Sequence, residues 1–307
     1  MNPIIAAFDP HSAARAPVEF GIAAARVTQA PLVVAAVVKG GQSTAAAGEA
    51  GADGEGALER LRLDLERRDV AADIRVFDDG SPAQGLERAM RELDPELVVV
   101  GATRRSAAGS MLVGTTAERI LHSSRCPVAV VPQGYEAPAE GVRLIGVAFA
   151  PTPEGQDALH AAAALARSRH VGLRAITVLD PRHAGQQSTG LLARQHHDTD
   201  PAEDQHVRER LGAEAAFRSA VAETASDLDV DLDVLAQDPA DGLVAAAAHV
   251  DMLVMGSRAY GPKRAVLLGS VSRQVMERAA CPVLIIPRGA SEATATLLTD
   301  AESSGSV

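Results

Sequence analysis

Short apolar runs alternate with amphipathic segments along the first half of the chain. Runs without polar breaks are typical of strands that are buried on both faces of a parallel sheet. Four such runs are present, at residues 4–8, 32–38, 97–100 and 128–131, and a fifth apolar segment at residues 74–77 is interrupted by Arg75. They predict five strands.

Helical patterns fill the intervals between these runs. Leu58, Leu61 and Leu65 recur at helical spacing and predict one apolar helix face. Ser81 followed by Pro82 is typical of a helix start, with a capping hydroxyl and a proline at the first helical position. The predicted helices cover residues 18–27, 58–69, 82–93 and 115–123. This alternation predicts an α/β fold, with an open parallel sheet, helices on both faces and a ligand site outside the carboxyl ends of the strands.

The same pattern occurs twice in the chain. Gly101 and Gly114 are 13 residues apart, and so are Gly256 and Gly269. In both copies a Cys-Pro pair follows the second glycine after 12 residues, and the offset between the copies is 155. Self-similarity of this kind is the mark of a repeated structural unit. The predicted fold is therefore two similar open parallel five-stranded sheets with helices on both faces.

The two copies differ in length. Their starts align at an offset of 141, which places Ala150 opposite Asp9, so 14 residues (155 − 141 = 14) are inserted in the second copy. Residues 180–206, rich in Gln, His, Asp and Ser, are predicted to form a mobile loop that contains the insertion, and residues 39–56 form its shorter counterpart. The expected organisation is a first unit at residues 1–133, a second unit at 142–288 and a disordered tail at 289–307.

Composition and net charge argue against several classes of function. The net charge is −11, which argues against a basic nucleic-acid surface or docking on an anionic membrane. No run of about 18 apolar residues is present to span a bilayer, and the apolar run near the start is too short for a signal peptide. Two cysteines, Cys126 and Cys281, are too few for a disulfide framework and are interpreted as small buried residues. A cytoplasmic protein that binds neither nucleic acid nor membrane is expected.

The paired glycines point to a phosphate site. A glycine at the end of a strand lets the backbone turn close to a ligand, and free amides at a helix start favour an anion. At the end of the first strand, the Asp9 carboxylate is suited to accept hydrogen bonds from a ribose hydroxyl or an adenine amino group. The candidate residues are Asp9, Gly101, Gly114, Thr115 and Thr116 in the first unit, and Gly256, Gly269, Ser270 and Val271 in the second.

Both glycine loops resemble those of the universal stress protein family, in which a Gly-x2-Gly-x9-Gly-Ser/Thr loop joins the fourth strand to the last helix. The resemblance covers both units. It implies an adenine nucleotide, ATP, as the ligand, with Val37 or Val178 against the base. It also implies that the last strands of two units pair back to back, here as an internal pseudo-dimer. Further dimerisation of whole chains stays open, and a protein partner of unknown identity is expected.

The sequence departs from the family pattern at three positions. The second glycine of the motif is Arg104 in the first unit and Ala259 in the second, and Ala150 replaces the acid of the first strand. Arg104 is a candidate phosphate ligand, because its guanidinium carries several donors. Other interpretations stay open: tight turns at the glycines, plain N-caps at Thr115 and Ser270, and a turn of Asp9 with Pro10.

No catalytic group is predicted. The chain lacks a P-loop, a Rossmann glycine motif and a nucleophile elbow. His196, His197 and His206 fit no defined ligand spacing, so no metal site is expected. The leading hypothesis is a non-catalytic stress-response protein that binds ATP. The alternatives are an interaction scaffold that has lost nucleotide binding, and an enzyme of the adenine-nucleotide hydrolase type.

Overall fold

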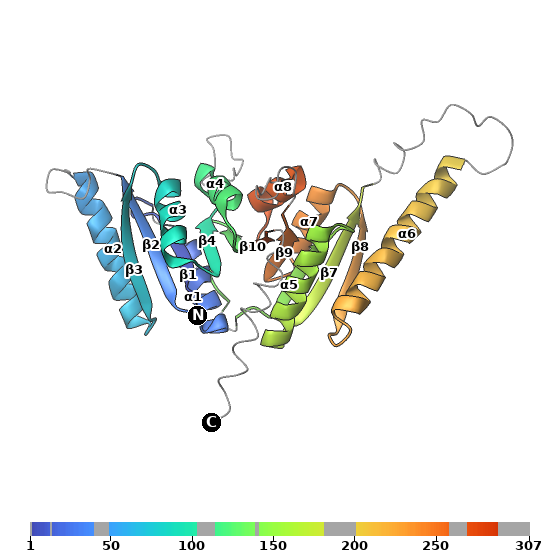
Figure 1. Ribbon diagram of the computed structural model, residues 1–307, viewed down its shortest axis with the longest axis horizontal. Helices are drawn as coiled ribbons and strands as arrows, with labels where there is room; N and C mark the ends of the chain where they lie inside the picture. The colour runs from blue at the N-terminus through green and yellow to red at the C-terminus, as the bar shows by residue number, and fades with distance from the viewer. Residues whose placement is uncertain are drawn as a thin grey trace, which may run out of the picture.

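The computed structural model describes residues 2–12, 14–39, 49–102, 114–138, 141–180, 201–257 and 269–287. Each unit alternates strands and helices (Figure 1). The first contains β1 (Ile4–Phe8), α1 (Ala16–Thr28), β2 (Leu32–Lys39), α2 (Glu49–Arg67), β3 (Ala72–Asp79), α3 (Pro82–Leu93), β4 (Leu97–Gly101), α4 (Thr115–Ser123) and β5 (Val128–Val131). The second contains β6 (Leu144–Phe149), α5 (Pro153–Arg169), β7 (Gly172–Leu179), α6 (Pro201–Thr224), β8 (Val230–Ala236), α7 (Pro239–Ala247), β9 (Met252–Gly256), α8 (Ser270–Arg278) and β10 (Val283–Ile286).

The strands form one sheet in the order β3-β2-β1-β4-β5-β10-β9-β6-β7-β8. All neighbours within a unit are parallel, which confirms the predicted α/β architecture of two five-stranded halves. The chain leaves β1 in one direction to form β2 and β3, and returns on the other side to form β4 and β5. The order therefore reverses between β1 and β4, where a parallel α/β sheet leaves a crevice.

The two halves join through their last strands. β5 and β10 pair antiparallel, with Val130 opposite Val283 and Val128 opposite Ile285. This confirms the expected internal pseudo-dimer. Pairing also removes two apolar edges that would otherwise be open to other chains.

Helices cover both faces of the sheet. One apolar layer packs residues of α1, α2, α5 and α6 against the strands, and the opposite layer packs residues of α3, α4, α7 and α8. Both layers run through β5 and β10, so the two units share a continuous core. Ser81 and Asp238 cap α3 and α7 with their side chains, as Ser81 was predicted to do.

Two helices begin earlier than the sequence suggested. α2 starts at Glu49 and α6 at Pro201, so residues 49–56 and 201–206 are helical and not loop. Glycines obscured the start of α2, because each costs about 1 kcal/mol in a helix relative to alanine. The buried Leu61 and Leu65 further along nonetheless anchor the helix. Residues 40–48 and 181–200 and the predicted tail lie outside the described residues.

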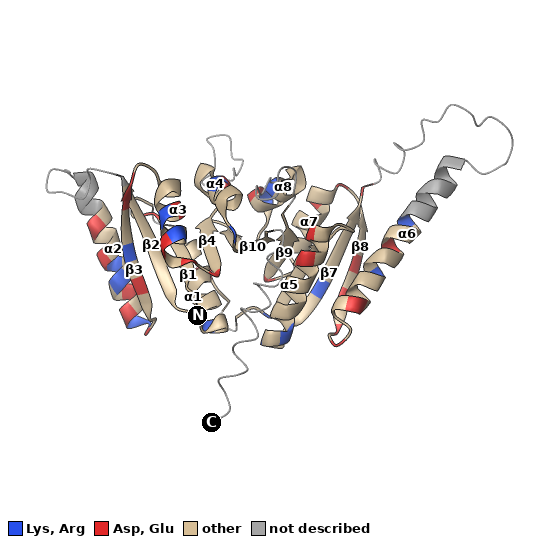
Figure 2. Ribbon diagram, viewed as in Figure 1, with Lys and Arg blue, Asp and Glu red and all other residues tan. Residues whose placement is uncertain are grey.

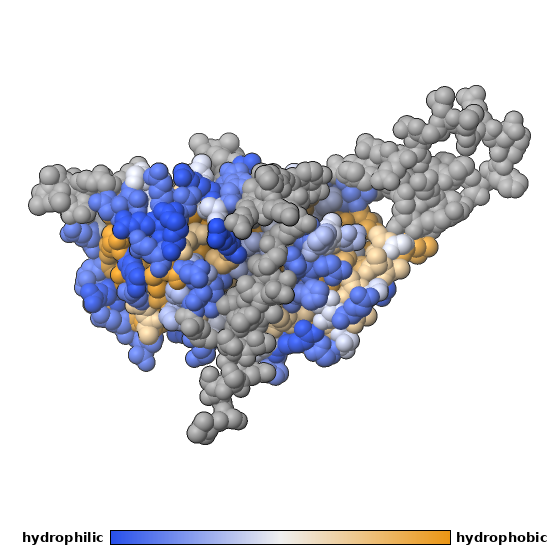
Figure 3. All heavy atoms as spheres, viewed as in Figure 1, coloured by the Kyte–Doolittle hydropathy of each residue, from blue (hydrophilic) through white to orange (hydrophobic). Residues whose placement is uncertain are grey.

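Charged side chains gather on the outermost helices. Acidic and basic residues alternate along α2 and α6 (Figure 2). Apolar colour is visible near both ends of the sheet (Figure 3), and the exposed large hydrophobic residues of the described chain are Leu63, Val76 and Leu211. None of the described helices is long and apolar enough to span a membrane.

Glu96 is a buried acid at the start of β4, and we expect it to make stability depend on pH. Its side chain is 7% exposed, and burial raises its pKa from 4.5 to about 7, against a hydrogen bond with Thr28 that lowers the pKa. The folded state therefore holds a proton that the unfolded state releases. Stability should fall as the pH rises from about 4.5 to about 7 and then level off, by about 2–3 kcal/mol in all.

The Glu96→Gln variant tests this expectation, because its neutral amide keeps the shape of the protonated acid. Urea denaturation at pH 5 and pH 8 should find the variant about as stable as the native chain at the lower pH and more stable at the higher pH. An equal difference between the two proteins at both pH values would contradict it.

Candidate functional site

A cleft of about 1410 Å³ opens at the carboxyl ends of the strands in the first unit. It lies at the reversal of strand order between β1 and β4. The six first-unit candidates that the structure describes all line it: Asp9, Val37, Gly101, Gly114, Thr115 and Thr116. Arg104 and Ala259 lie outside the described residues. Tertiary folding thus brings together residues that are as many as 107 positions apart in sequence (116 − 9 = 107).

Asp9 adopts the turn that the sequence left open as an alternative to ligand binding. The backbone N–H of His11 donates to its Oδ1 at 3.0 Å, and the Ser12 N–H donates to its carbonyl oxygen. Asp9 is exposed at the edge of the cleft. Within the described chain, Oδ2 accepts no hydrogen bond, so one carboxylate oxygen stays available to a ligand.

The start of α4 differs from the predicted N-cap. Gly114, and not Thr115, occupies the cap position, and the same holds for Gly269 and Ser270 at the start of α8. A glycine has no side chain to accept from the first amides, and within the described chain neither helix has a side-chain cap. The interpretation of Thr115 and Ser270 as plain N-caps is therefore wrong by one residue. At α4 the consequence is a set of uncapped N–H groups, with the positive end of the helix dipole, inside the cleft.

Val37 lies on the wall of the cleft with its side chain against a glycine. A Cβ on Gly85 of α3 would approach Val37 Cγ2 to 2.6 Å, so the valine fills the space that any other residue at position 85 would need. Val178 has the same relation to Gly242 of α7, where a Cβ would approach its Cγ1 to 3.0 Å. These helix glycines hold both valines at the carboxyl end of the sheet.

Pro17 lies in the first turn of α1 and lines the cleft. It stands at the second position of α1, where its missing N–H is tolerated. With the offset of 141, the start of α1 at Ala16 corresponds to position 157, four residues beyond the start of α5 at Pro153. The first unit therefore lacks about one helical turn that the second unit has. Residues that would form that turn, among them Ser12 and Ala14, line the cleft.

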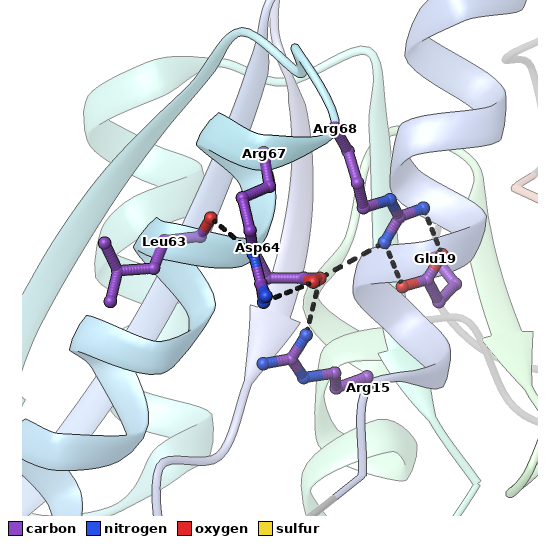
Figure 4. Close-up of polar contacts among 6 residues, drawn as sticks. All are labelled: Arg15, Glu19, Leu63, Asp64, Arg67 and Arg68. Carbon is purple, nitrogen blue, oxygen red and sulfur yellow. Dashed lines mark hydrogen bonds and ion pairs between the residues drawn. The ribbon is translucent and has the colours of Figure 1, made fainter.

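An ion-pair network borders the cleft (Figure 4). Arg15, before α1, contacts Asp64 of α2 at 2.6 Å, and Arg68 forms a two-pronged contact with Glu19 of α1 at 2.7 and 2.8 Å. Hydrogen bonding to Glu19 raises the pKa of Arg68. Arg67 adds a third cation at 3.4 Å from Asp64. Of these residues, Arg15, Glu19 and Arg68 line the cleft, together with the carboxylates of Asp9 and Glu136.

Sequence reasoning missed this network. Arg15 and Asp64 are 49 residues apart, as are Glu19 and Arg68. The equal separation is visible in the sequence, but it has meaning only once α1 and α2 are known to lie on the same face of the sheet. Within a chain rich in charges, no local pattern singles these residues out.

The strand end next to the glycine loop is more crowded in the second unit. The main chain of Glu154, in the first turn of α5, lies directly against Gly256, so that a Cβ on Gly256 would fall onto the Glu154 carbonyl group. In the first unit, the described residue that a Cβ on Gly101 would meet is Pro17, whose ring lies 3.3 Å away. Ala150 also lacks the carboxylate of Asp9. The structure brings Gly256, Gly269, Ser270 and Val271 to equivalent places, yet around a crowded strand end.

The cysteines agree with their interpretation as packing residues. Both are free, and burial raises the pKa of Cys126 to about 11 and that of Cys281 to about 12. Both thiols are therefore protonated at neutral pH and weakly nucleophilic. In the described part of the chain, no group of three or more His, Cys, Asp or Glu side chains is arranged to hold a metal. His196 and His197 are outside that part, and the side chain of His206 is not described.

Family comparison agrees with the duplicated architecture. The model of the universal stress protein family matches twice, at residues 1–132 and 141–287. The chain belongs to the universal stress protein family. A universal stress protein of Mycobacterium tuberculosis is 26% identical over 215 residues, which cover 67% of this chain and 69% of the relative. Another, from Mycolicibacterium smegmatis, is 30% identical over 203 residues, covering 62% of this chain and 61% of the relative.

Solved structures share the fold of the whole chain. A functionally unknown protein of Pseudomonas aeruginosa PAO1 superimposes with a TM-score of 0.66 at 16% identity, covering 99% of this chain and 98% of the other. A universal stress protein of Archaeoglobus fulgidus gives a TM-score of 0.62 at 20% identity, with coverage of 94% and 99%. At these sequence identities, the comparison shows only that the fold is shared.

Proposed function

We propose that this universal stress protein binds one adenine nucleotide, ATP, in the cleft of its first unit and does not catalyse a reaction on it. The observation that carries the proposal is the convergence of Asp9, Val37 and the uncapped start of α4 on one cleft. A carboxylate, an apolar wall and free amides suit a ribose or adenine, a base face and a phosphate, respectively.

The size of the cleft supports the same ligand. The cleft exceeds the roughly 300–1,000 Å³ that small-molecule sites need, so a nucleotide has room. Arg15 and Arg68 line it, and each is paired with a carboxylate, so a phosphate would have to compete with Asp64 and Glu19 for their guanidinium groups.

The second unit serves a structural role in this proposal. Ala150 offers no acceptor, and the first turn of α5 fills the space against Gly256. Its glycine loop then serves chain geometry and close helix packing. We therefore expect one nucleotide per chain and not two.

Binding would act through α4. Its amino end is in the cleft, and its Glu118 contacts Arg273 of α8 in the second unit at 3.4 Å. A phosphate at the helix start would stabilise one position of α4 and so bias the surface where α4 and α8 meet. A protein partner that recognises this surface would then respond to the nucleotide.

Calorimetric titration with ATP tests the proposal directly. We expect saturable heat with a stoichiometry near one per chain, and a rise in thermal midpoint that grows with ATP concentration, because a ligand that binds only the folded state stabilises it. The Asp9→Ala variant should bind more weakly. No heat and no thermal shift at millimolar ATP would refute nucleotide binding and favour the scaffold hypothesis, while sustained ATP turnover that Asp9→Ala abolishes would favour the enzyme hypothesis.

A further inference from the structure

The junction between the two units has an approximate two-fold axis at one residue pair. Ala129 and Leu284 are equivalent positions, because 129 + 155 = 284, and they lie directly opposite each other in the β5–β10 ladder. On either side, Val128 faces Ile285 and Val130 faces Val283. At the centre of the ladder, therefore, a residue faces its own counterpart from the other unit, as on the two-fold axis of a symmetric interface.

The central pair combines a small residue with a large one. Ala129 is fully buried and Leu284 is 5% exposed, and both belong to the same apolar layer. Side chains directly opposite in an antiparallel ladder are close, with Cβ atoms about 4.5–5.5 Å apart. Two alanines here would leave a gap, and two leucines would crowd the layer.

A second pair near the axis combines opposite charges. Glu118 of α4 and Arg273 of α8 are also equivalent, because 118 + 155 = 273, and their side chains are 3.4 Å apart. Two first units paired in this way would bring glutamate against glutamate. Two second units would bring arginine against arginine.

We propose that β5 and α4 of the first unit form a surface that fits the second unit and disfavours a copy of itself. The two copies of an ancestral surface differ at both self-facing positions, in volume at 129 and 284 and in charge at 118 and 273. Both differences favour the pairing of unlike units. They penalise pairing between like units of different chains, which would link chains through the same apolar strands.

The size complementarity is tested by exchanging the two residues in the full chain. Leu284→Ala and Ala129→Leu alone should each lower the thermal midpoint by on the order of 5 °C, the first through a cavity and the second through crowding. The double variant A129L/L284A should recover more than half of the summed loss, because the axis makes the two arrangements nearly equivalent.

A matched control separates this rescue from general repacking. Leu173 of β7 is a buried leucine of the same layer in the second unit, outside the central ladder. Combined with Ala129→Leu, the Leu173→Ala variant should lose stability additively, as distant sites do. If A129L/L284A is also additive, or if both single variants are as stable as the native chain, the proposal is overturned.

The charge pair provides an independent test that disturbs no core. Glu118→Arg and Arg273→Glu should each lower the thermal midpoint by about 1–2 °C in low salt, and E118R/R273E should recover part of the summed loss, with the coupling lost at 1 M salt. Recovery is partial because Arg273 also pairs with Glu277 at 3.4 Å, a contact that glutamate at position 273 loses. Should Ala129→Leu alone be too crowded to fold, a folded A129L/L284A supports the proposal, and its failure to fold counts against it. If the single charge variants leave the thermal midpoint unchanged and the exchange gives no recovery, the Glu118–Arg273 pair does not contribute to the preference for unlike units. None of these measurements involves nucleotide, so the outcome is separate from that of the proposed function.

Discussion

Replacing Gly256 with alanine is expected to lower the free energy of unfolding by about 2–3 kcal/mol, whereas Gly101→Ala should change it by less than about 1 kcal/mol. The two glycines are equivalent in the repeat, being 155 positions apart. Their surroundings differ. A Cβ on Gly256 would collide with the main chain of Glu154, which can move only with the first turn of α5, but a Cβ on Gly101 meets the edge of the Pro17 ring at 3.3 Å.

Backbone conformation does not explain this difference. Neither glycine is among the residues with positive φ, so alanine is sterically allowed by the local backbone. Replacing glycine also restricts the unfolded chain, which stabilises by about 0.4–1 kcal/mol where the new methyl group fits. That gain offsets the mild contact at Gly101 and is outweighed at Gly256.

Urea denaturation of the two variants and the native chain measures the contrast. The native chain and Gly101→Ala should have similar midpoints, and Gly256→Ala a clearly lower one with an unchanged slope. Equal losses in both variants would mean that the first-unit glycine is as tightly packed as its counterpart, which would contradict the asymmetry on which the one-site proposal depends.

Glutamate at position 115 is expected to weaken ATP binding at least tenfold, while glutamate at position 270 leaves it unchanged. Thr115 and Ser270 are equivalent, exposed first residues of α4 and α8. A carboxylate at Thr115 would occupy the uncapped amides and repel a phosphate in the cleft. In our proposal the second unit binds no ligand, so Ser270→Glu should leave ATP binding unchanged.

The stability of the two variants, Thr115→Glu and Ser270→Glu, is the internal control. An acid in the first turn of a helix stabilises by about 0.3–1 kcal/mol, so neither Thr115→Glu nor Ser270→Glu should be destabilised. Binding is then measured by calorimetry on two equally stable proteins. If Ser270→Glu also weakens binding, or halves the stoichiometry from two to one, the second unit binds nucleotide and the assignment to the first unit alone is wrong.

Most of the fold could be predicted from local patterns. Most strand positions followed from continuous apolar runs, and the duplication followed from glycine spacing, because both depend only on residues near in sequence. Errors arose where local propensity misled. Glycines concealed the start of α2 at Glu49, and the hydroxyls of Thr115 and Ser270 suggested caps one residue too late.

Several residues of the candidate site could be predicted from the sequence, but the packing around them could not. Six residues predicted from the sequence line one cleft, and Arg104 lies outside the described residues. How crowded each strand end is could not be predicted, because it depends on where α1 and α5 begin relative to a strand end more than 80 positions away (101 − 17 = 84). The arginines at the rim were missed for the same reason.

By itself the sequence determined that a strand–helix unit is repeated, where its strands lie, and which residues form the two glycine loops. Those features follow from periodicity and spacing, which depend on residues close together in the sequence. Only the tertiary structure decided that α5 packs against Gly256 while Pro17 packs against Gly101, that Arg15 and Arg68 reach the cleft, and that Ala129 faces Leu284. These contacts depend on strand order, on register and on helix starts, which bring distant residues together through the packing of the whole sheet.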